Sequence, residues 1–170
     1  MTKIIKLALF LSVVCVISAG ILSYTNSITA PIIAQNKQVT LNKMLNEVVS
    51  DADEFQTEAI GKDGIVNVHK AMKAGEVISY IYEISVFGFQ SQITALVSID
   101  TDGNYNGFKV VSYAETPGYG DVIEKEPYIN QFTTKTVDDE IDTVAGSTVT
   151  TMPVKLAIEA AAAHFIENFK

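Results

Sequence analysis

The feature that most constrains this chain is a long uncharged stretch near its N-terminus. No acidic or basic side chain occurs between Leu7 and Asn36, and Leu7–Leu22 is almost wholly apolar. Tyr24 follows as an aromatic residue of the kind found at membrane interfaces. A helix needs about 20 predominantly apolar residues to cross the hydrocarbon core of a bilayer. The stretch therefore predicts one N-terminal transmembrane helix.

A cleaved signal peptide is the alternative for this segment. Lys3 and Lys6 would form its basic region, and Ser18–Gly20 resembles a small-residue cleavage site. The apolar run is longer than a typical signal-peptide core, which favours a retained single-pass anchor in the cell (inner) membrane. No Lys follows Lys6 until Lys37, so the positive-inside rule places the N-terminus in the cytoplasm and the remaining chain outside it.

The chain beyond the span is acidic. Without Lys3 and Lys6 it has 10 Lys against 20 Asp and Glu, a formal charge of −10, which argues against a nucleic-acid partner. The sequence contains no Arg, so a bound phosphate must be held by backbone amides, hydroxyls, Lys or a covalent bond. Cys15, the sole cysteine, lies in the span, which excludes an intramolecular disulfide and a cysteine-based metal site in this chain alone.

The segment after the span predicts a helix that stands off the membrane. Pro31 disfavours helical geometry at Ala30, so the chain is expected to bend where it leaves the membrane. From Ile32 to about Ser50, apolar residues recur at helical spacing. We therefore expect residues 1–30 to form a cytoplasmic tip and anchor, and residues 31–50 a linker helix.

Residues 51–170 are expected to form the extracytoplasmic domain. The polar stretch 51–73 predicts short strand-like pieces and loops. Three strand-sized runs follow with tight links, and they predict an antiparallel meander over 77–86, 93–99 and 107–113. Asp100–Asn104 is a turn cluster between the last two runs; a calcium loop is disfavoured there because Val111, at its twelfth position, cannot bind the ion.

The C-terminal segment predicts an amphipathic helix. Its apolar stripe consists of Val154, Ile158, Ala161, Ala162, Phe165 and Phe169. Pro153 fits a first helical turn, and Thr150 or Thr151 could supply the N-cap hydroxyl. The predicted fold class is therefore α+β: an antiparallel sheet packed by helices, with one N-terminal transmembrane helix.

Two segments combine residue types that suit a cofactor. Asp142–Thr151 has a small-residue turn and several hydroxyls, and it leads into a helix N-terminus, whose unpaired N–H groups attract phosphate. The same pattern also occurs at ordinary capped helices. In Glu115–Asp121, Gly118 and Gly120 let the backbone approach a flat ring, while Glu115 or Thr116 could hydrogen-bond its polar edge. An ordinary Pro-Gly turn is the alternative for that segment.

Both segments resemble motifs of the FMN-binding domain family. The first is similar to the family's flavinylation pattern Asp-x-x-Ser/Thr-Gly-Ala-Thr, with Asp142, Gly146 and Thr148 matching, and Ala145 and Ser147 departing from it. The second is similar to the family's Glu-Thr-Pro-Gly-Leu-Gly-Asp. The short aromatic segment 87–89 also resembles a turn of the family, where we expect a core or turn role rather than a flavin contact.

The resemblance implies a covalent flavin. In the family the final Thr of the motif is joined to FMN through a phosphoester by a dedicated flavin transferase, and that position is Thr148 here. The cofactor-binding residues it suggests, together with the two motif segments, are Thr148, Asp142, Gly146, Ser147, Thr150, Thr151, Glu115, Thr116 and Gly118.

The resemblance also implies an electron-transfer role within a larger membrane complex. The chain length favours the G subunit of an Rnf-type ion-translocating ferredoxin:NAD oxidoreductase, whose other subunits would be its partners. The alternatives are the C subunit of a Na⁺-translocating NADH:quinone oxidoreductase, a membrane-tethered flavin- or ligand-binding sensor, and a structural domain without a ligand. We expect no catalytic residue or metal site in this chain itself, since His69 and His164 have no suitably spaced partners.

Overall fold

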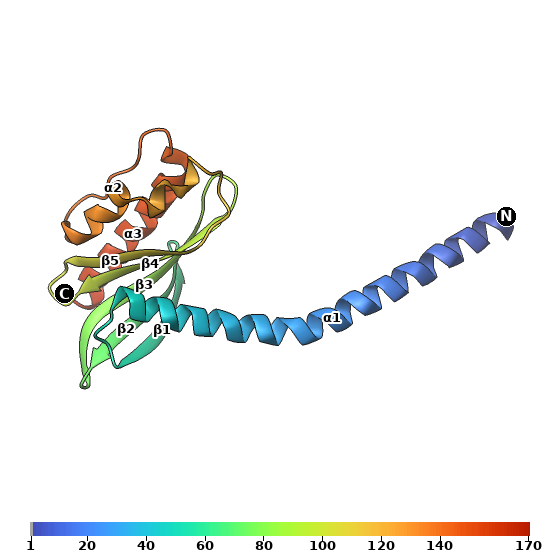
Figure 1. Ribbon diagram of the computed structural model, residues 1–170, viewed down its shortest axis with the longest axis horizontal. Coiled ribbons are helices and arrows are strands. Elements are labelled where there is room, and N and C mark those ends of the chain that lie inside the picture. The colour runs from blue at the N-terminus through green and yellow to red at the C-terminus, as the bar shows by residue number, and fades with distance from the viewer. Residues whose placement is uncertain (1) are drawn as a thin grey trace. The chain divides into compact units, whose positions relative to one another are not determined.

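The computed structural model describes residues 2–170 and contains a long N-terminal helix, a five-stranded sheet and helices packed on that sheet (Figure 1). The chain divides into two compact units, one up to Asn42 and the other Lys43–Lys170. The elements in chain order are α1 (Thr2–Val48), β1 (Glu54–Lys62), β2 (Ile65–Lys73), β3 (Glu76–Phe87), β4 (Gln92–Asp100), β5 (Tyr105–Ser112), η1 (Gly120–Glu124), α2 (Glu126–Ile129), η2 (Asn130–Thr133) and α3 (Thr148–Asn168).

Helix α1 contains the predicted span. Its segment Lys3–Ile33 is long and apolar enough to cross a membrane. The helix continues through Pro31, so the prediction that Ala30 leaves helical geometry is wrong. Proline lacks an N–H group and deprives only the carbonyl four residues earlier of its partner. The rest of the backbone ladder can therefore continue past the proline.

The sheet is an antiparallel meander in the order β1-β2-β3-β4-β5. Strands β3, β4 and β5 confirm the three strands predicted from the sequence. Strands β1 and β2 correct the prediction of short pieces and loops for residues 51–73, because each is nine residues long. Strand β1 lies at the sheet edge and is mostly exposed, so it lacks the apolar alternation of a half-buried strand.

Tight turns connect the first three strands. Asp63 and Gly64 have φ angles of 54° and 82°, and Ala74 and Gly75 have 53° and 86°. Two successive residues with positive φ match the right-handed twist of a two-residue hairpin. The Asp-Gly pair at 63–64 is the sequence feature that indicates a hairpin within the stretch expected to be irregular.

The main core lies between one face of the sheet and α3. The predicted apolar stripe of α3 is confirmed, with Phe169 half-buried just beyond the helix end. It packs against buried side chains of the central strands, among them Tyr82, Ile84, Val97 and Ile99. Helix α3 is thereby fixed on the sheet, and its N-terminus is held at one end of the domain (Figure 1).

The last turn of α1 covers part of the opposite face of the sheet. Leu45 and Val49 are buried there. Gly107 of β5 leaves room for this contact, because a Cβ atom at that position would lie 2.9 Å from Cγ1 of Val48. Glu47 and Lys109 form an ion pair at the edge of the contact. Packing, in addition to helical propensity, therefore holds residues 43–48 against the sheet.

Helix α3 begins earlier than the sequence predicts. Its N-cap is Ser147, without a side-chain capping bond, whereas Thr150 and Thr151 were the expected caps. Gly146, with a φ of +85°, reverses the chain just before the helix. Pro153 is consequently inside the helix rather than in its first turn. It leaves unpaired a carbonyl near the solvent-exposed start of the helix, where water can satisfy it.

Candidate cofactor site

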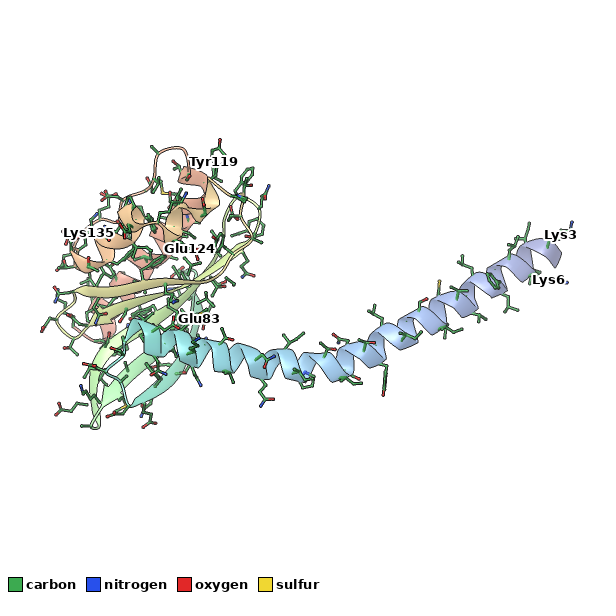
Figure 2. The ribbon with its side chains drawn as sticks, in the orientation of Figure 1. Lys3, Lys6, Glu83, Tyr119, Glu124 and Lys135 are labelled. Carbon is green, nitrogen blue, oxygen red and sulfur yellow. The ribbon has the colours of Figure 1, made fainter. Side chains whose placement is uncertain are left out.

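The two motif segments meet around one cavity at an end of the domain. The cavity measures about 340 Å³, within the range of about 300–1,000 Å³ typical of small-molecule sites. It is lined by Phe89, Glu115, Thr116, Tyr119, Gly120, Gly146, Ser147, Val149 and Thr150. Tyr119 lies at the upper edge of the domain in Figure 2. Tertiary structure therefore brings together the two segments that the sequence analysis singled out.

Three large apolar side chains at the cavity are exposed to solvent. Phe89, Tyr119 and Val149 are 61%, 63% and 62% exposed, and they come from three separate segments. Grouped, exposed side chains of this size usually mark a surface that a ligand or partner covers. The cavity thus offers apolar contacts for a flat ring.

Phe89 belongs to the turn between β3 and β4. The prediction of a turn at 87–89 is confirmed, but both aromatic rings there are exposed, so neither has a core role. Phe89 lines the cavity, which the sequence analysis did not expect. Gly88 brings this turn close to Glu115, since an added Cβ would lie 2.8 Å from its Oε1. The sequence signal for such a contact is the aromatic residue next to the turn glycine at 88.

Glu115 is buried at the back of the cavity and accepts five hydrogen bonds. Its Oε1 accepts from the Gln90 N–H at 3.0 Å, and from the Ser91 N–H and hydroxyl at 2.8 and 3.0 Å. Its Oε2 accepts from the Phe89 N–H at 3.1 Å and the Thr150 hydroxyl at 3.2 Å. Burial alone would raise the pKa of Glu115, but the backbone and hydroxyl donors outweigh it and lower that pKa.

The two glycines of the Glu115–Asp121 loop occupy different positions relative to the cavity. Gly118, with a φ of +87°, forms an exposed turn in which its N–H donates to Asp121 at 2.9 Å. Gly120 lines the cavity, and a Cβ there would lie 2.0 Å from Cβ of Glu115. Of the two glycines expected to let the backbone approach a flat ring, Gly120 lines the cavity and Gly118 does not; the approach to a ring stays a prediction. Thr116 also lines the cavity, and its hydrogen bond to a flavin stays a prediction.

The start of α3 carries four hydroxyl side chains, and they differ in exposure. Ser147, Thr150 and Thr151 are buried, whereas Thr148 is exposed. Thr150 donates to Glu115, and Thr151 donates to the Ser147 carbonyl at 3.1 Å. Ser147 and Thr150 line the cavity, and their contact with a cofactor stays a prediction. Thr151 serves the fold of the helix start. Thr148, the first residue of α3, is therefore the accessible hydroxyl of this segment.

Asp142 lies on the outer side of the motif turn and is not a lining residue. Its carboxylate pairs with Lys135, and its N–H donates to the Gln131 side chain at 2.8 Å. The hydrogen bond from Lys135 and its positive charge lower the pKa of Asp142. Nearby, Lys155 pairs with Glu140. The two lysines beside the motif are thus engaged with carboxylates.

The remaining candidate ligands have structural partners. Among residues 2–170, no group of three or more His, Cys, Asp or Glu side chains is placed to hold a metal ion. His69 is buried and lies 2.8 Å from the hydroxyl of Thr57, and His164 is 3.1 Å from that of Tyr82. The predicted turn at Asp100 is confirmed; its carboxylate accepts backbone N–H groups within the β4–β5 hairpin.

Comparisons with known proteins match both parts of the chain. A family model described as the FMN-binding domain covers residues 88–163, and one described as the RnfG N-terminal region covers residues 1–48. The G subunit of the ion-translocating oxidoreductase complex of Haemophilus influenzae is 32% identical over 76% of this chain and 67% of its own length. The chain belongs to this family of G subunits.

The chain is also similar to further G subunits and to one solved structure. The G subunit of the proton-translocating ferredoxin:NAD(+) oxidoreductase complex of Clostridium ljungdahlii is 29% identical over 89% of this chain and 85% of its own length. The chain spans 64% of the length of a G subunit from Cereibacter sphaeroides, to which it is 30% identical. The solved structure of NqrC from Shewanella oneidensis covers 66% of each chain, with a TM-score of 0.48 and 21% identity.

The family match confirms the predicted FMN-binding domain. The matched range begins at Gly88 and ends within α3, so it includes every residue that lines the cavity. The N-terminal match ends at Val48, where α1 ends. The RnfG N-terminal region is therefore recognised in the helix with the membrane-span candidate, and the FMN-binding domain in the part of the chain that forms the cavity.

Proposed function

We propose that this chain is the electron-transfer G subunit of an Rnf-type membrane complex and carries FMN covalently, through a phosphoester, on Thr148. The observation that carries the proposal is that a cavity and an exposed threonine lie at the same helix N-terminus. An aromatic-lined cavity opens beside the N-terminus of α3, and the first residue of that helix is an exposed threonine. A flavin has a flat apolar ring at one end and a phosphate at the other, which suits this pair of features.

The position of the phosphate follows from which backbone donors are occupied. Two groups of N–H donors border the cavity: the turn at residues 89–91 and the first turn of α3. The Glu115 carboxylate fills the first group. In the first turn of α3, the N–H groups of Thr150 and Thr151 donate to the Ser147 carbonyl at 3.0 and 2.9 Å. The N–H groups ahead of them, at residues 148 and 149, belong to the helix end that lacks intrahelical acceptors, and the positive end of the helix dipole there favours phosphate. We therefore place the phosphate at the start of α3. Because the sequence contains no Arg, no guanidinium group of this chain can bind the phosphate elsewhere.

Exposure selects the residue of attachment. A flavin transferase must reach the hydroxyl that it modifies, and Thr148 is exposed, whereas its hydroxyl neighbours at 147, 150 and 151 are buried. We assign Asp142 and Gly146 to the shape of the turn that the transferase recognises. Gly146 has the positive φ that this turn requires, and Asp142 is tied to the adjacent loop through Gln131.

The protein orients the flavin, which supplies the redox chemistry when bound. Phe89, Tyr119 and Val149 provide the apolar contacts for its ring, and Gly120 keeps the adjacent wall free of a side chain. The cavity rim is open to solvent at these residues, so a redox partner can approach closely. The chain contributes this site to the complex, and the other subunits contribute the ferredoxin and NAD chemistry.

The anchor sets the location of the site. We propose that residues 1–30 form a cytoplasmic tip and membrane span, residues 31–50 a linker, and residues 51–170 an extracytoplasmic domain. Lys3 and Lys6 before the span support this orientation. The flavin would then lie outside the cytoplasm, beside the other membrane subunits.

The attachment can be tested by in-gel flavin fluorescence after denaturation, with the chain produced together with a flavin transferase. Thr148→Ala should abolish the fluorescence and the corresponding mass increase. Thr148→Ser should keep both, as should Ser147→Ala, because it changes a buried hydroxyl only one residue away. A labelled peptide modified at residue 147, 150 or 151 would contradict the assignment. Flavin that is released by denaturant would instead indicate a non-covalent flavin-binding or sensor domain.

A further inference from the structure

Glu115 lies where three segments distant in sequence converge. It follows β5, and its carboxylate reaches the β3–β4 turn 24 to 26 residues earlier and α3 35 residues later. Three successive N–H groups of the turn, at residues 89–91, point at this one carboxylate. Such a run of amides forms an anion-binding concavity, here occupied by a side chain of the protein itself.

One oxygen of this carboxylate connects the two sides of the cavity. Oε2 accepts both the Phe89 N–H at 3.1 Å and the Thr150 hydroxyl at 3.2 Å. Phe89 lines the cavity, and Thr150 lies in the first turn of α3, two residues after Thr148. The separation between the aromatic wall and the start of the helix is therefore set through a single atom.

Backbone of two glycine-containing segments lies close to the Glu115 side chain. A Cβ at Gly88 would lie 2.8 Å from Oε1, and one at Gly120 would lie 2.0 Å from Cβ of Glu115. Both glycines thus allow backbone to close on the side chain from two directions. Its five hydrogen bonds also use the acceptor capacity of a carboxylate, about four lone-pair sites. Glu115 is therefore poorly suited to bind the ring directly.

We infer that Glu115 is a positioning residue, whose carboxylate fixes the Phe89 wall relative to the start of α3 and so sets how the flavin ring lies with respect to its point of attachment. The inference rests on the proposed function for its flavin, but the clasp formed by Glu115, residues 89–91 and Thr150 exists without the cofactor. Attachment depends on the exposed turn before Thr148 and should not require this clasp. Ring orientation and reduction potential should require it.

Three variants of the full-length chain in detergent test the clasp. Glu115→Gln replaces one acceptor oxygen by an NH₂ group, which cannot accept hydrogen bonds. The variant side chain can therefore no longer accept from the donors that contact both oxygens of Glu115. Thr150→Val removes a single hydrogen bond at similar side-chain volume. Thr150→Ser restores the hydroxyl and is the matched control. Loss of one hydrogen bond to a charged group should raise the open fraction of the clasp roughly 10- to 100-fold.

Hydrogen exchange of segment 88–91 in the apo chain measures the clasp without flavin. Protection should fall roughly 10- to 100-fold in Thr150→Val and Glu115→Gln and return in Thr150→Ser. In the flavinylated chain, the first two variants should keep SDS-stable flavin. They should lose much of the flavin's visible circular dichroism and shift its reduction potential, while Thr150→Ser should match wild type.

The outcomes separate this inference from the proposed function. Unchanged dichroism and potential in both Glu115→Gln and Thr150→Val would overturn it, and so would loss of covalent flavin in a folded Glu115→Gln, which would place Glu115 in the attachment step. If Glu115→Gln does not fold, Thr150→Val decides, because it keeps the carboxylate and four of its hydrogen bonds. A wild-type chain without flavin would refute the proposed function, while hydrogen exchange would still test the clasp.

Discussion

Gly120 offers a sharp test of how the cavity is assembled, because its role depends on space alone. An added Cβ would lie 2.0 Å from Cβ and 2.8 Å from Cγ of Glu115, with the Glu115 Cα at 3.3 Å. These atoms belong to the stem of a side chain whose carboxylate is held by five hydrogen bonds, so they cannot move without breaking that arrangement. Gly120→Ala should therefore strain the loop and displace the carboxylate together.

The expected loss of stability follows from these two effects. Overpacking a buried site costs about 1–3 kcal/mol, and each hydrogen bond to a charged group that is lost adds about 1.5–3 kcal/mol. With one such hydrogen bond lost, we expect a total of at least about 2.5 kcal/mol. Gly118 is the matched control because its Cβ would meet nothing within 4 Å and only its φ of +87° opposes a side chain. Gly118→Ala should cost about 1–2 kcal/mol.

Thermal unfolding of the full-length chain in detergent measures the difference. At about 4 °C per kcal/mol for a domain of this size, Gly120→Ala should lower the Tm by at least about 10 °C and Gly118→Ala by about 4–8 °C. Gly120→Ala should also reduce the hydrogen-exchange protection of residues 89–91, whereas Gly118→Ala should leave it intact. A Tm decrease for Gly120→Ala equal to or smaller than that for Gly118→Ala would refute the reasoning.

Three further predictions concern topology, pH and the motif aspartate. In a Cys15→Ser background, a cysteine at Ser50 should react with an impermeant maleimide in intact cells; labelling only after lysis would reverse the orientation. The pKa of Glu115 is lower in the folded domain than in the unfolded chain. The ionised Glu115 should therefore stabilise the fold at pH values above its unfolded-state pKa, and this contribution should be lost as the pH falls through its folded-state pKa. The difference in unfolding free energy between wild type and Glu115→Gln, from denaturant titrations, should thus be constant down to about pH 5 and shrink below it; a constant difference at all pH values would contradict this. Asp142→Asn should leave the Tm nearly unchanged, because the Asp142 carboxylate is exposed, yet lower covalent flavin content by in-gel fluorescence; unchanged content would remove Asp142 from recognition.

Several elements could be predicted because the spacing of apolar residues along a segment indicates which of its faces is buried. The uncharged run from Leu7 predicts the long apolar helix, and the stripe from Val154 to Phe165 predicts the face of α3 that packs on the sheet. The three central strands are apolar enough to show their pattern directly. Strand β1 could not be recognised in this way because edge position, rather than its own composition, makes it a strand.

The sequence by itself determined the class of fold, the anchor and the two segments that form the site. Only tertiary structure decided what individual residues of those segments do. Glu115 could be expected to contact a flavin because a carboxylate near a glycine turn is a good hydrogen-bond acceptor, yet both of its oxygens serve protein donors. Gly120 rather than Gly118 lines the cavity, and Phe89 joins it from another turn. The physical reason is that the roles of Glu115 and Phe89 depend on atoms that meet across 24 to 35 residues of chain, and local periodicity carries no information about such contacts.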